Sequence, residues 1–347
     1  MNLLTWRFFS MALLLAIAVA MPSVTKAQVP MNEIPLGGGT TSGGTTAGTK
    51  SDTTAGTITS IDGETTAGGE LTPVEAAKTA GPEAAAFDGT YVWVATQFSD
   101  SITRIRVSDG AVAGTFAVGR RPVALLYAAS YLWVANLLSN NVTKIAPSTG
   151  AIVATYATGE GPGGLAFDGT NIWVANRNSN TVTKLRASNG SNLGTFAVGK
   201  RPIGLAFAAN SIWVANNFSN SVTRLSLSGA VLGTYAVGRG PFGIAAQADN
   251  VWVTNYFGQS LTKLRAADGF NLGTFKIGDG AAGILFDGNN LWVVNNGDST
   301  VVKVSPATGS IISTYITGKG PFTVAFDGNK IYVPNFGSNT VSTTAAN

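Results

Sequence analysis

The sequence has no cysteine and no histidine, and each absence excludes a kind of chemistry. Without cysteine there is no disulfide framework, no thiolate metal site and no lipid attachment to a cysteine. Without histidine the chain lacks the usual general base near neutral pH and the imidazole ligand of zinc and haem sites. Catalysis would therefore depend on carboxylates, and stability on burial alone.

The carboxylates are themselves few, since charged residues make up 12% of the chain. Four aspartates each precede a glycine between two strand-like runs, where Asp-Gly favours a tight hairpin turn. One carboxylate per turn is too few for calcium, which needs several oxygen ligands. We therefore expect no catalytic residues, no metal and no cofactor, and assign turn roles to Asp88, Asp168, Asp287 and Asp327.

Only one apolar run is long enough to suggest contact with a membrane. It covers residues 8–21, after Arg7 and before Pro22, and a small-residue ending follows at Ala27. This run is shorter than the roughly 20 residues of a spanning helix, and its flanks are typical of a cleavable signal peptide. Residues 1–27 are thus predicted to be a signal peptide, the mature protein to be secreted or periplasmic, and no integral membrane segment to remain after cleavage.

Residues 28–70 are rich in threonine, glycine, serine and alanine, and they carry five acidic residues against one lysine. Such a segment has too few large apolar side chains to build a core. We expect a disordered acidic linker here, followed by a single domain over residues 71–347.

Within residues 71–347 a tryptophan returns about every 40 residues, with a tyrosine in the seventh place. A period of about 40 with four β-like runs in each repeat is typical of propeller blades. The sequence therefore predicts an all-β, seven-bladed propeller of four-stranded antiparallel blades, as a monomer. The repeated aromatics, expected to pack between blades, are Trp93, Trp133, Trp173, Trp213, Trp252, Trp292 and Tyr332.

The fourth, outer run of the repeat occurs six times only. Because an unpaired sheet edge exposes backbone donors and acceptors, the ring is expected to close with an N-terminal strand that completes the last blade. Residues 72–79, directly before the first blade, are predicted to supply it.

The second and third runs of each repeat also suggest a family. NIWVAN at 171–176, followed by SNTVTKL at 179–185, resembles the YVTN family of seven-bladed propellers, a neighbour of the virginiamycin B lyase propellers. The resemblance covers residues 72–347, and it implies an exported or surface protein; a few relatives act as lyases or bind nucleic acid. The lyase relatives use a catalytic histidine, which this chain lacks, so the resemblance transfers no lyase site to it.

In a propeller the loops that join outer to inner strands, and second to third strands, share one rim, here called the top face. These loops collect cations and aromatics, whereas the opposite hairpins are acidic. Such a mixture suits an anionic chain, a glycan or a protein partner. The candidate ligand-binding residues are Arg120, Arg121, Arg177, Lys200, Arg201, Phe218, Arg239, Tyr256, Phe257, Lys319 and Phe336.

The first hypothesis is an exported, non-enzymatic binding or scaffold module that recognises a protein or glycan at this top face. One alternative is a divergent virginiamycin B lyase-like enzyme, or another hydrolase or lyase that uses carboxylates and a metal. A second is a single-stranded nucleic-acid binder. The simplest alternative is that the aromatics fold back to plug the funnel and the cations are ordinary surface charges.

Overall fold

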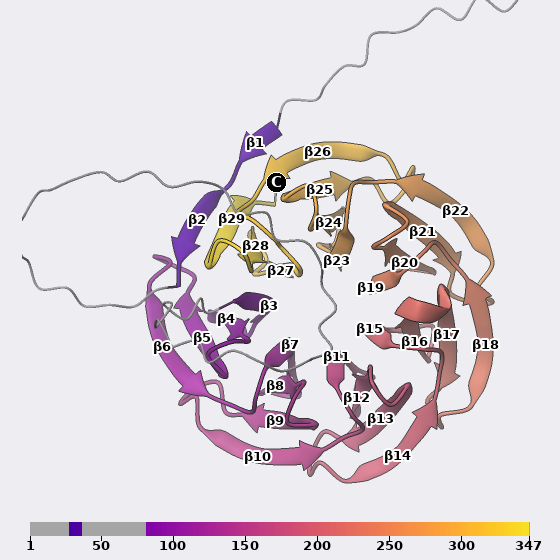
Figure 1. Ribbon diagram of the computed structural model, residues 1–347, viewed down its shortest axis with the longest axis horizontal. Coiled ribbons are helices and arrows are strands. Elements are labelled where there is room, and N and C mark those ends of the chain that lie inside the picture. The colour runs from indigo at the N-terminus through magenta and orange to yellow at the C-terminus, as the bar shows by residue number, and fades with distance from the viewer. Residues whose placement is uncertain (1–27, 37–80, 347) are drawn as a thin grey trace, which may run out of the picture.

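The computed structural model describes residues 28–36 and 81–346, which form seven sheets arranged in a ring (Figure 1). Each sheet is a blade whose first strand lies nearest the axis and whose fourth strand lies at the outer side, and one blade has a short parallel fifth strand added beyond the fourth. The prediction of a seven-bladed propeller with four-stranded antiparallel blades is confirmed.

The first three blades follow the chain without interruption. Blade 1 consists of β3 (Pro82–Phe87), β4 (Tyr91–Thr96), β5 (Ser101–Arg106) and β6 (Val112–Ala117). Blade 2 consists of β7 (Pro122–Ala128), β8 (Tyr131–Asn136), β9 (Asn141–Ile145) and β10 (Ile152–Ala157). Blade 3 consists of β11 (Pro162–Phe167), β12 (Asn171–Asn176), β13 (Thr181–Arg186) and β14 (Asn192–Ala197).

The next two blades repeat this order, with one short 3-10 helix, η1 (Asn217–Ser219), in a top-face loop. Blade 4 consists of β15 (Pro202–Ala208), β16 (Ser211–Asn216), β17 (Ser221–Ser226) and β18 (Val231–Ala236). Blade 5 consists of β19 (Pro241–Gln247), β20 (Asn250–Asn255), β21 (Ser260–Arg265) and β22 (Asn271–Lys276).

The last two blades each include one N-terminal strand. Blade 6 consists of β23 (Ala281–Phe286), β24 (Leu291–Asn295), β25 (Thr300–Val304), β26 (Ile311–Ile316) and β1 (Gln28–Pro30). Blade 7 consists of β27 (Ala325–Phe326), β28 (Lys330–Asn335), β29 (Thr340–Ala345) and β2 (Asn32–Pro35).

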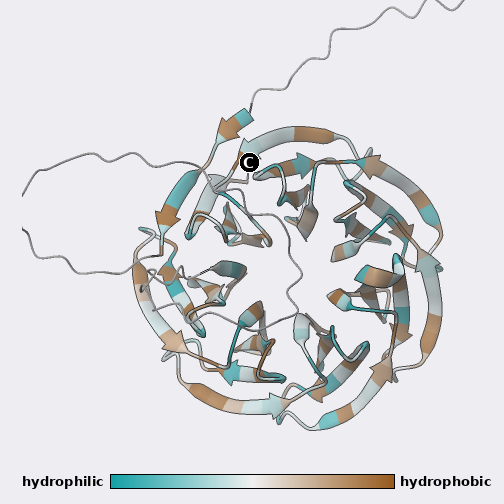
Figure 2. Ribbon diagram, in the orientation of Figure 1, coloured by the Kyte–Doolittle hydropathy of each residue, from teal (hydrophilic) through white to brown (hydrophobic). Residues whose placement is uncertain are grey.

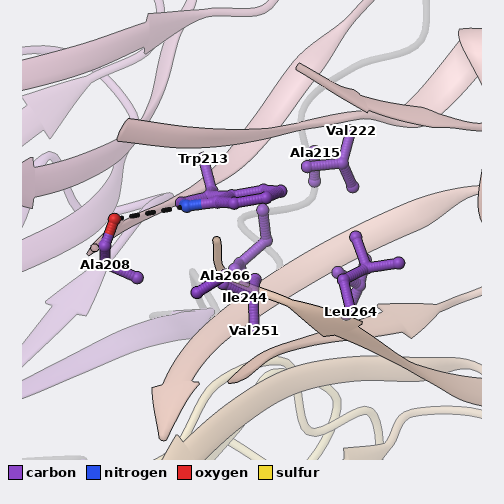
Figure 3. Close-up of a cluster of buried hydrophobic side chains, with 9 residues drawn as sticks. Ala208, Trp213, Ala215, Val222, Ile244, Val251, Leu264 and Ala266 are labelled. Atoms are coloured by element: carbon purple, nitrogen blue, oxygen red, sulfur yellow. Dashed lines mark hydrogen bonds between the residues drawn. The ribbon is translucent and has the colours of Figure 1, made fainter. Parts of the chain in front are cut away.

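The core lies between neighbouring blades. Trp213 of blade 4 is fully buried and packs on Ile244, Val251 and Leu264 of blade 5 (Figure 3). Equivalent clusters join the other blades, because both faces of the second strand are apolar and neither can face water. The outermost strands are different: in β10 exposed and half-buried residues alternate, and Figure 2 shows hydrophobic and hydrophilic stretches following one another around the rim.

A cation from the third strand links each of the first six blades to the next. In blade 3, Lys184 Nζ lies 5.0 Å from the Trp173 ring and donates to the backbone carbonyl of Leu227 in blade 4 at 2.6 Å. The cation thus joins a π contact and a charge-assisted hydrogen bond across the blade boundary. The residues that make both contacts are Arg104, Lys144, Lys184, Arg224, Lys263 and Lys303.

The ring is closed by an N-terminal strand, but by a different one from that predicted. β2 pairs antiparallel with β29 and fills the outer position of blade 7. The prediction that residues 72–79 supply this strand is wrong, and residues 28–36, expected to belong to the linker, form strands of the ring. Residues 1–27, with the predicted signal peptide, and residues 37–80, with the rest of the predicted linker, lie outside the described residues.

The position of Ile34 explains why this segment can close the ring. Ile34 of β2 is paired with Val341 of β29, just as Phe196 of β14 is paired with Val182 of β13 in blade 3. Ile34 also lies against Gly110 of blade 1, as Phe196 lies against Gly229 of the next blade. In sequence, NEIPLG at 32–37 has the apolar, small and glycine spacing of GTFAVG at 194–199. Residues 32–37 are therefore the missing seventh copy of the outer motif.

Replacing Ile34 by alanine is expected to lower the free energy of unfolding by about 1–3 kcal/mol, because a half-buried side chain at the closing seam loses its packing. Replacing Val74 by alanine, in the segment first expected to close the ring, should change it by less than about 0.5 kcal/mol. Urea unfolding of both variants measures the difference. An equal cost for the two would contradict the assignment of β2 as the closing strand.

Candidate ligand-binding funnel

The first strands of the blades surround a cavity of about 220 Å³ on the ring axis. Its wall is mainly apolar and includes Val123, Leu165, Ile203 and Phe322. Small residues let the strands approach one another closely: a Cβ at Gly164 would collide with the backbone carbonyl of Ile203. The inner wall is therefore formed by closely spaced strands with mainly apolar side chains around an open centre.

Glu83 is the one acidic residue in this wall, and sequence analysis missed it. It is the second residue of β3, a place that is uncharged in every other repeat. Comparing the seven copies at this single position would have found it. The equivalent residues are Val123, Gly163, Ile203, Phe242, Ala282 and Phe322.

Arg177 of blade 3 also lines the cavity. It follows the last residue of β12, and its Nε lies 2.6 Å from where a Cβ on Gly163 would stand. The missing side chain of Gly163 thus makes room for the guanidinium. The Nε is buried and has no hydrogen-bond partner among the described residues. Such an unsatisfied buried donor is costly and normally has a reason.

Burial dominates the electrostatics of the pair. Loss of solvent raises the pKa of Glu83 to about 7, against the opposing influence of Arg177 and Arg121. Burial likewise lowers the pKa of Arg177, which Glu83 counteracts and which Arg201 and Arg121 reinforce. Within the described residues the ion pairs are Arg106–Asp109 and Arg265–Asp268, so Glu83 and Arg177 do not touch.

Two pockets on the top face adjoin the cavity. The first, of about 310 Å³, brings together four predicted site residues: Arg177, Lys200, Arg201 and Phe218. The second, of about 160 Å³, is lined by Arg201 with the predicted Tyr256 and Phe257. Arg201 stacks 4.5 Å above the Phe218 ring, and Phe218 and Phe257 are 58% and 56% exposed.

The remaining predicted residues lie in less accessible or more distant places. Arg121 donates from Nε to Oε1 of Gln97 at 2.6 Å, and its charge acts on Glu83 and Arg177. Phe336 is half-buried against Phe98 and Phe322, as expected of aromatics that fold back into the funnel. Three exposed cations line neither pocket nor the cavity: Arg120, Arg239 and Lys319.

The aspartates predicted for turns do hold turns. Asp168 Oδ1 accepts from the backbone N–H groups of Thr170 and Asn171, and Oδ2 accepts from Trp173 Nε1 at 2.8 Å. Residues 28–36 and 81–346 contain no group of three or more histidine, cysteine, aspartate or glutamate side chains placed to hold a metal ion. No helix in these ranges is long and apolar enough to cross a membrane.

No protein-family model matches the chain, and no curated protein matches it. Solved structures do. Hydrazine synthase of Kuenenia stuttgartiensis superposes with a TM-score of 0.71 at 17% identity, over 80% of this chain and 99% of that one. Virginiamycin B lyase from Staphylococcus aureus with quinupristin gives 0.66 at 19% identity, over 79% and 97%. A chain of the mitotic checkpoint complex gives 0.68 at 13%, over 82% and 98%. At these identities the likeness shows the fold alone. The similar proteins include enzymes and a component of an assembly.

Replacing Glu83 by glutamine should stabilise the fold in a pH-dependent way. The folded-state pKa of about 7 exceeds the ordinary value of 4.5, so the folded protein holds a proton that the unfolded chain releases. Wild-type stability therefore falls as pH rises from about 4.5 to about 7, and the variant is free of this loss. Urea unfolding near pH 8 should favour the variant by up to about 3 kcal/mol, with little difference near pH 4. A constant difference at both pH values would contradict the raised pKa.

Proposed function

We propose that this protein is an exported, non-enzymatic recognition module that binds a protein or glycan at the top face of its propeller. The observation that carries the proposal is the pocket where Arg177, Lys200, Arg201 and the exposed Phe218 meet above the axial cavity. Cations beside projecting aromatic rings are the usual anchors of recognition surfaces.

The arrangement of these side chains favours binding over chemistry. Arg201 is already ordered by its stacking on Phe218, so a ligand meets a preformed surface and loses less entropy in binding. The chain has no histidine or cysteine, and Asp168 and its counterparts are occupied in turns. These features support a binding role at this face.

The alternatives from the sequence have less support from the geometry. A carboxylate-dependent hydrolase or lyase needs two acids around one reacting centre, whereas Glu83 is the sole acid in the cavity wall. A single-stranded nucleic-acid binder is favoured by a continuous track of stacking rings, whereas Tyr256 and Phe336 pack inward here. The exported location is supported by the N-terminal apolar run of the sequence.

The test compares two variants that lose the same charge. Replacing Lys200 and Arg201 by glutamine removes two pocket cations, and replacing Arg186 and Lys330 by glutamine removes two exposed cations from the hairpin side. On immobilised heparin and poly-glutamate at about 50 mM salt, the pocket variant should bind about tenfold more weakly than wild type.

The hairpin-side variant should stay within about twofold of wild type, because a local site depends on position and non-specific attraction depends on net charge. Equal losses in the two variants, or no binding of either probe by wild type, would contradict an anion-recognising top face. Replacing Phe218 by alanine in the same assay tests the aromatic contribution.

A further inference from the structure

We propose that the axial cavity is a binding site for a small apolar carboxylic acid, whose carboxylate pairs with Arg177 and whose hydrocarbon body fills the channel. The proposal deepens the proposed function and rests on it, because the ligand reaches the cavity through the same top face. It concerns the cavity wall below the rim, which shares Arg177 with the top-face pocket.

The cavity has the size and wall of a site for a short hydrocarbon. Its volume of about 220 Å³ equals roughly seven water molecules in the liquid, so a body of six to eight carbon atoms fills it. The wall offers Val123, Leu165, Ile203 and Ile244, which suit an alkyl chain or a single ring.

The charges of the cavity call for an anion. Arg177 lines the cavity, Arg201 lines both adjoining pockets, and the charge of Arg121 acts on Glu83 and Arg177. Glu83 is the only acidic residue in the cavity wall. Arg121 is engaged with Gln97, and Arg201 is stacked on Phe218. Of these three arginines, Arg177 has a buried donor, Nε, with no hydrogen-bond partner among the described residues. One planar guanidinium matches one carboxylate in a bidentate pair.

Glu83 couples this binding to protons. Arg177 and Arg121 are the charged groups that act on Glu83, and Arg201 acts on Arg177; the other residues that line the cavity are uncharged. A bound carboxylate offsets the positive charge that favours ionised Glu83, so the pKa of Glu83 rises above about 7 on binding. Binding then takes up a proton from solvent, and affinity falls as pH rises past 7, by at most about tenfold per pH unit.

The test is calorimetry with hexanoate, octanoate and 3-phenylpropionate on the full chain, with hexanol as the uncharged control, near pH 6 and pH 8. Wild type should bind at least one acid, more weakly near pH 8 by about fivefold or more, and should not bind hexanol comparably. Replacing Glu83 by glutamine should leave binding with the same affinity at both pH values.

Replacing Arg177 by glutamine should weaken binding of the acid about tenfold or more near pH 6, whereas replacing the exposed Arg120 by glutamine should keep it within about twofold. Circular dichroism and urea unfolding verify that each variant is folded. No binding of any of the three acids by wild type, equal binding of hexanol, or an unchanged affinity in the folded Arg177 variant overturns the proposal.

The two proposals fail separately. If retention on heparin still depends on Lys200 and Arg201 while no acid binds, the cavity proposal alone is overturned. If the acids bind through Arg177 while retention shows no dependence on Lys200 and Arg201, the proposed recognition of larger anionic ligands at the rim alone is overturned.

Discussion

The ring depends on one interaction, in which a third-strand cation lies against a buried tryptophan and donates a hydrogen bond to a carbonyl of the next blade. Lys184 shows the arrangement, between Trp173 and Leu227. Because the indole is fully buried between two sheets, the cation satisfies the neighbouring backbone while its stem covers the ring. This contact fixes each of the first six blades against the following one. The repeat of about 40 residues is therefore the distance in sequence between successive contacts of this kind.

This cation contact is missing between blade 7 and blade 1, where the ring closes. Thr343 in β29 has the place that Lys184 has in β13, each opposite the aromatic of its blade. At this boundary β2 supplies the outer strand, Ile34 packs on blade 1, and Thr323 Oγ1 donates to the Glu83 carbonyl at 2.8 Å. At this boundary, contacts from the N-terminal strand β2 thus take the place of the cation contact that the seventh repeat lacks. Glu83 lies beside this boundary.

Most of the fold could be predicted from the sequence, because the residues that hold neighbouring blades together recur in each repeat. The aromatics of the second strands and the hairpin aspartates define seven blades. The order of the strands also assigns the loops correctly to the two faces. For example, the Arg177 N–H in one top-face loop donates a hydrogen bond to the Gly161 carbonyl in another top-face loop. The closing strand could not be found in this way, since β2 has four residues and lies far from the first blade in sequence. Only the spacing of Ile34, Leu36 and Gly37 marks it.

The residues proposed to bind a ligand are those at which the repeat is broken, and this is why they were harder to predict. Arg177 was expected on the rim, yet it lies within the cavity because Gly163 leaves room for it. Glu83 was overlooked because it lies in a strand that otherwise consists of core residues. Their proximity depends on the closed ring, which brings blade 1 and blade 3 around a common axis, and no local pattern contains that information.

The central claim is that Glu83 and Arg177 form a poorly solvated couple of opposite charge, not in direct ion-pair contact, in the wall of an open cavity. NMR titration of the Glu83 side-chain carboxyl tests it most directly, in wild type and in a variant with Arg177 replaced by glutamine. A midpoint near 7 that moves to higher pH in the variant is predicted, because loss of the guanidinium removes the larger of the two charges that oppose burial. A midpoint near the ordinary 4.5 that is the same in both proteins would contradict the account.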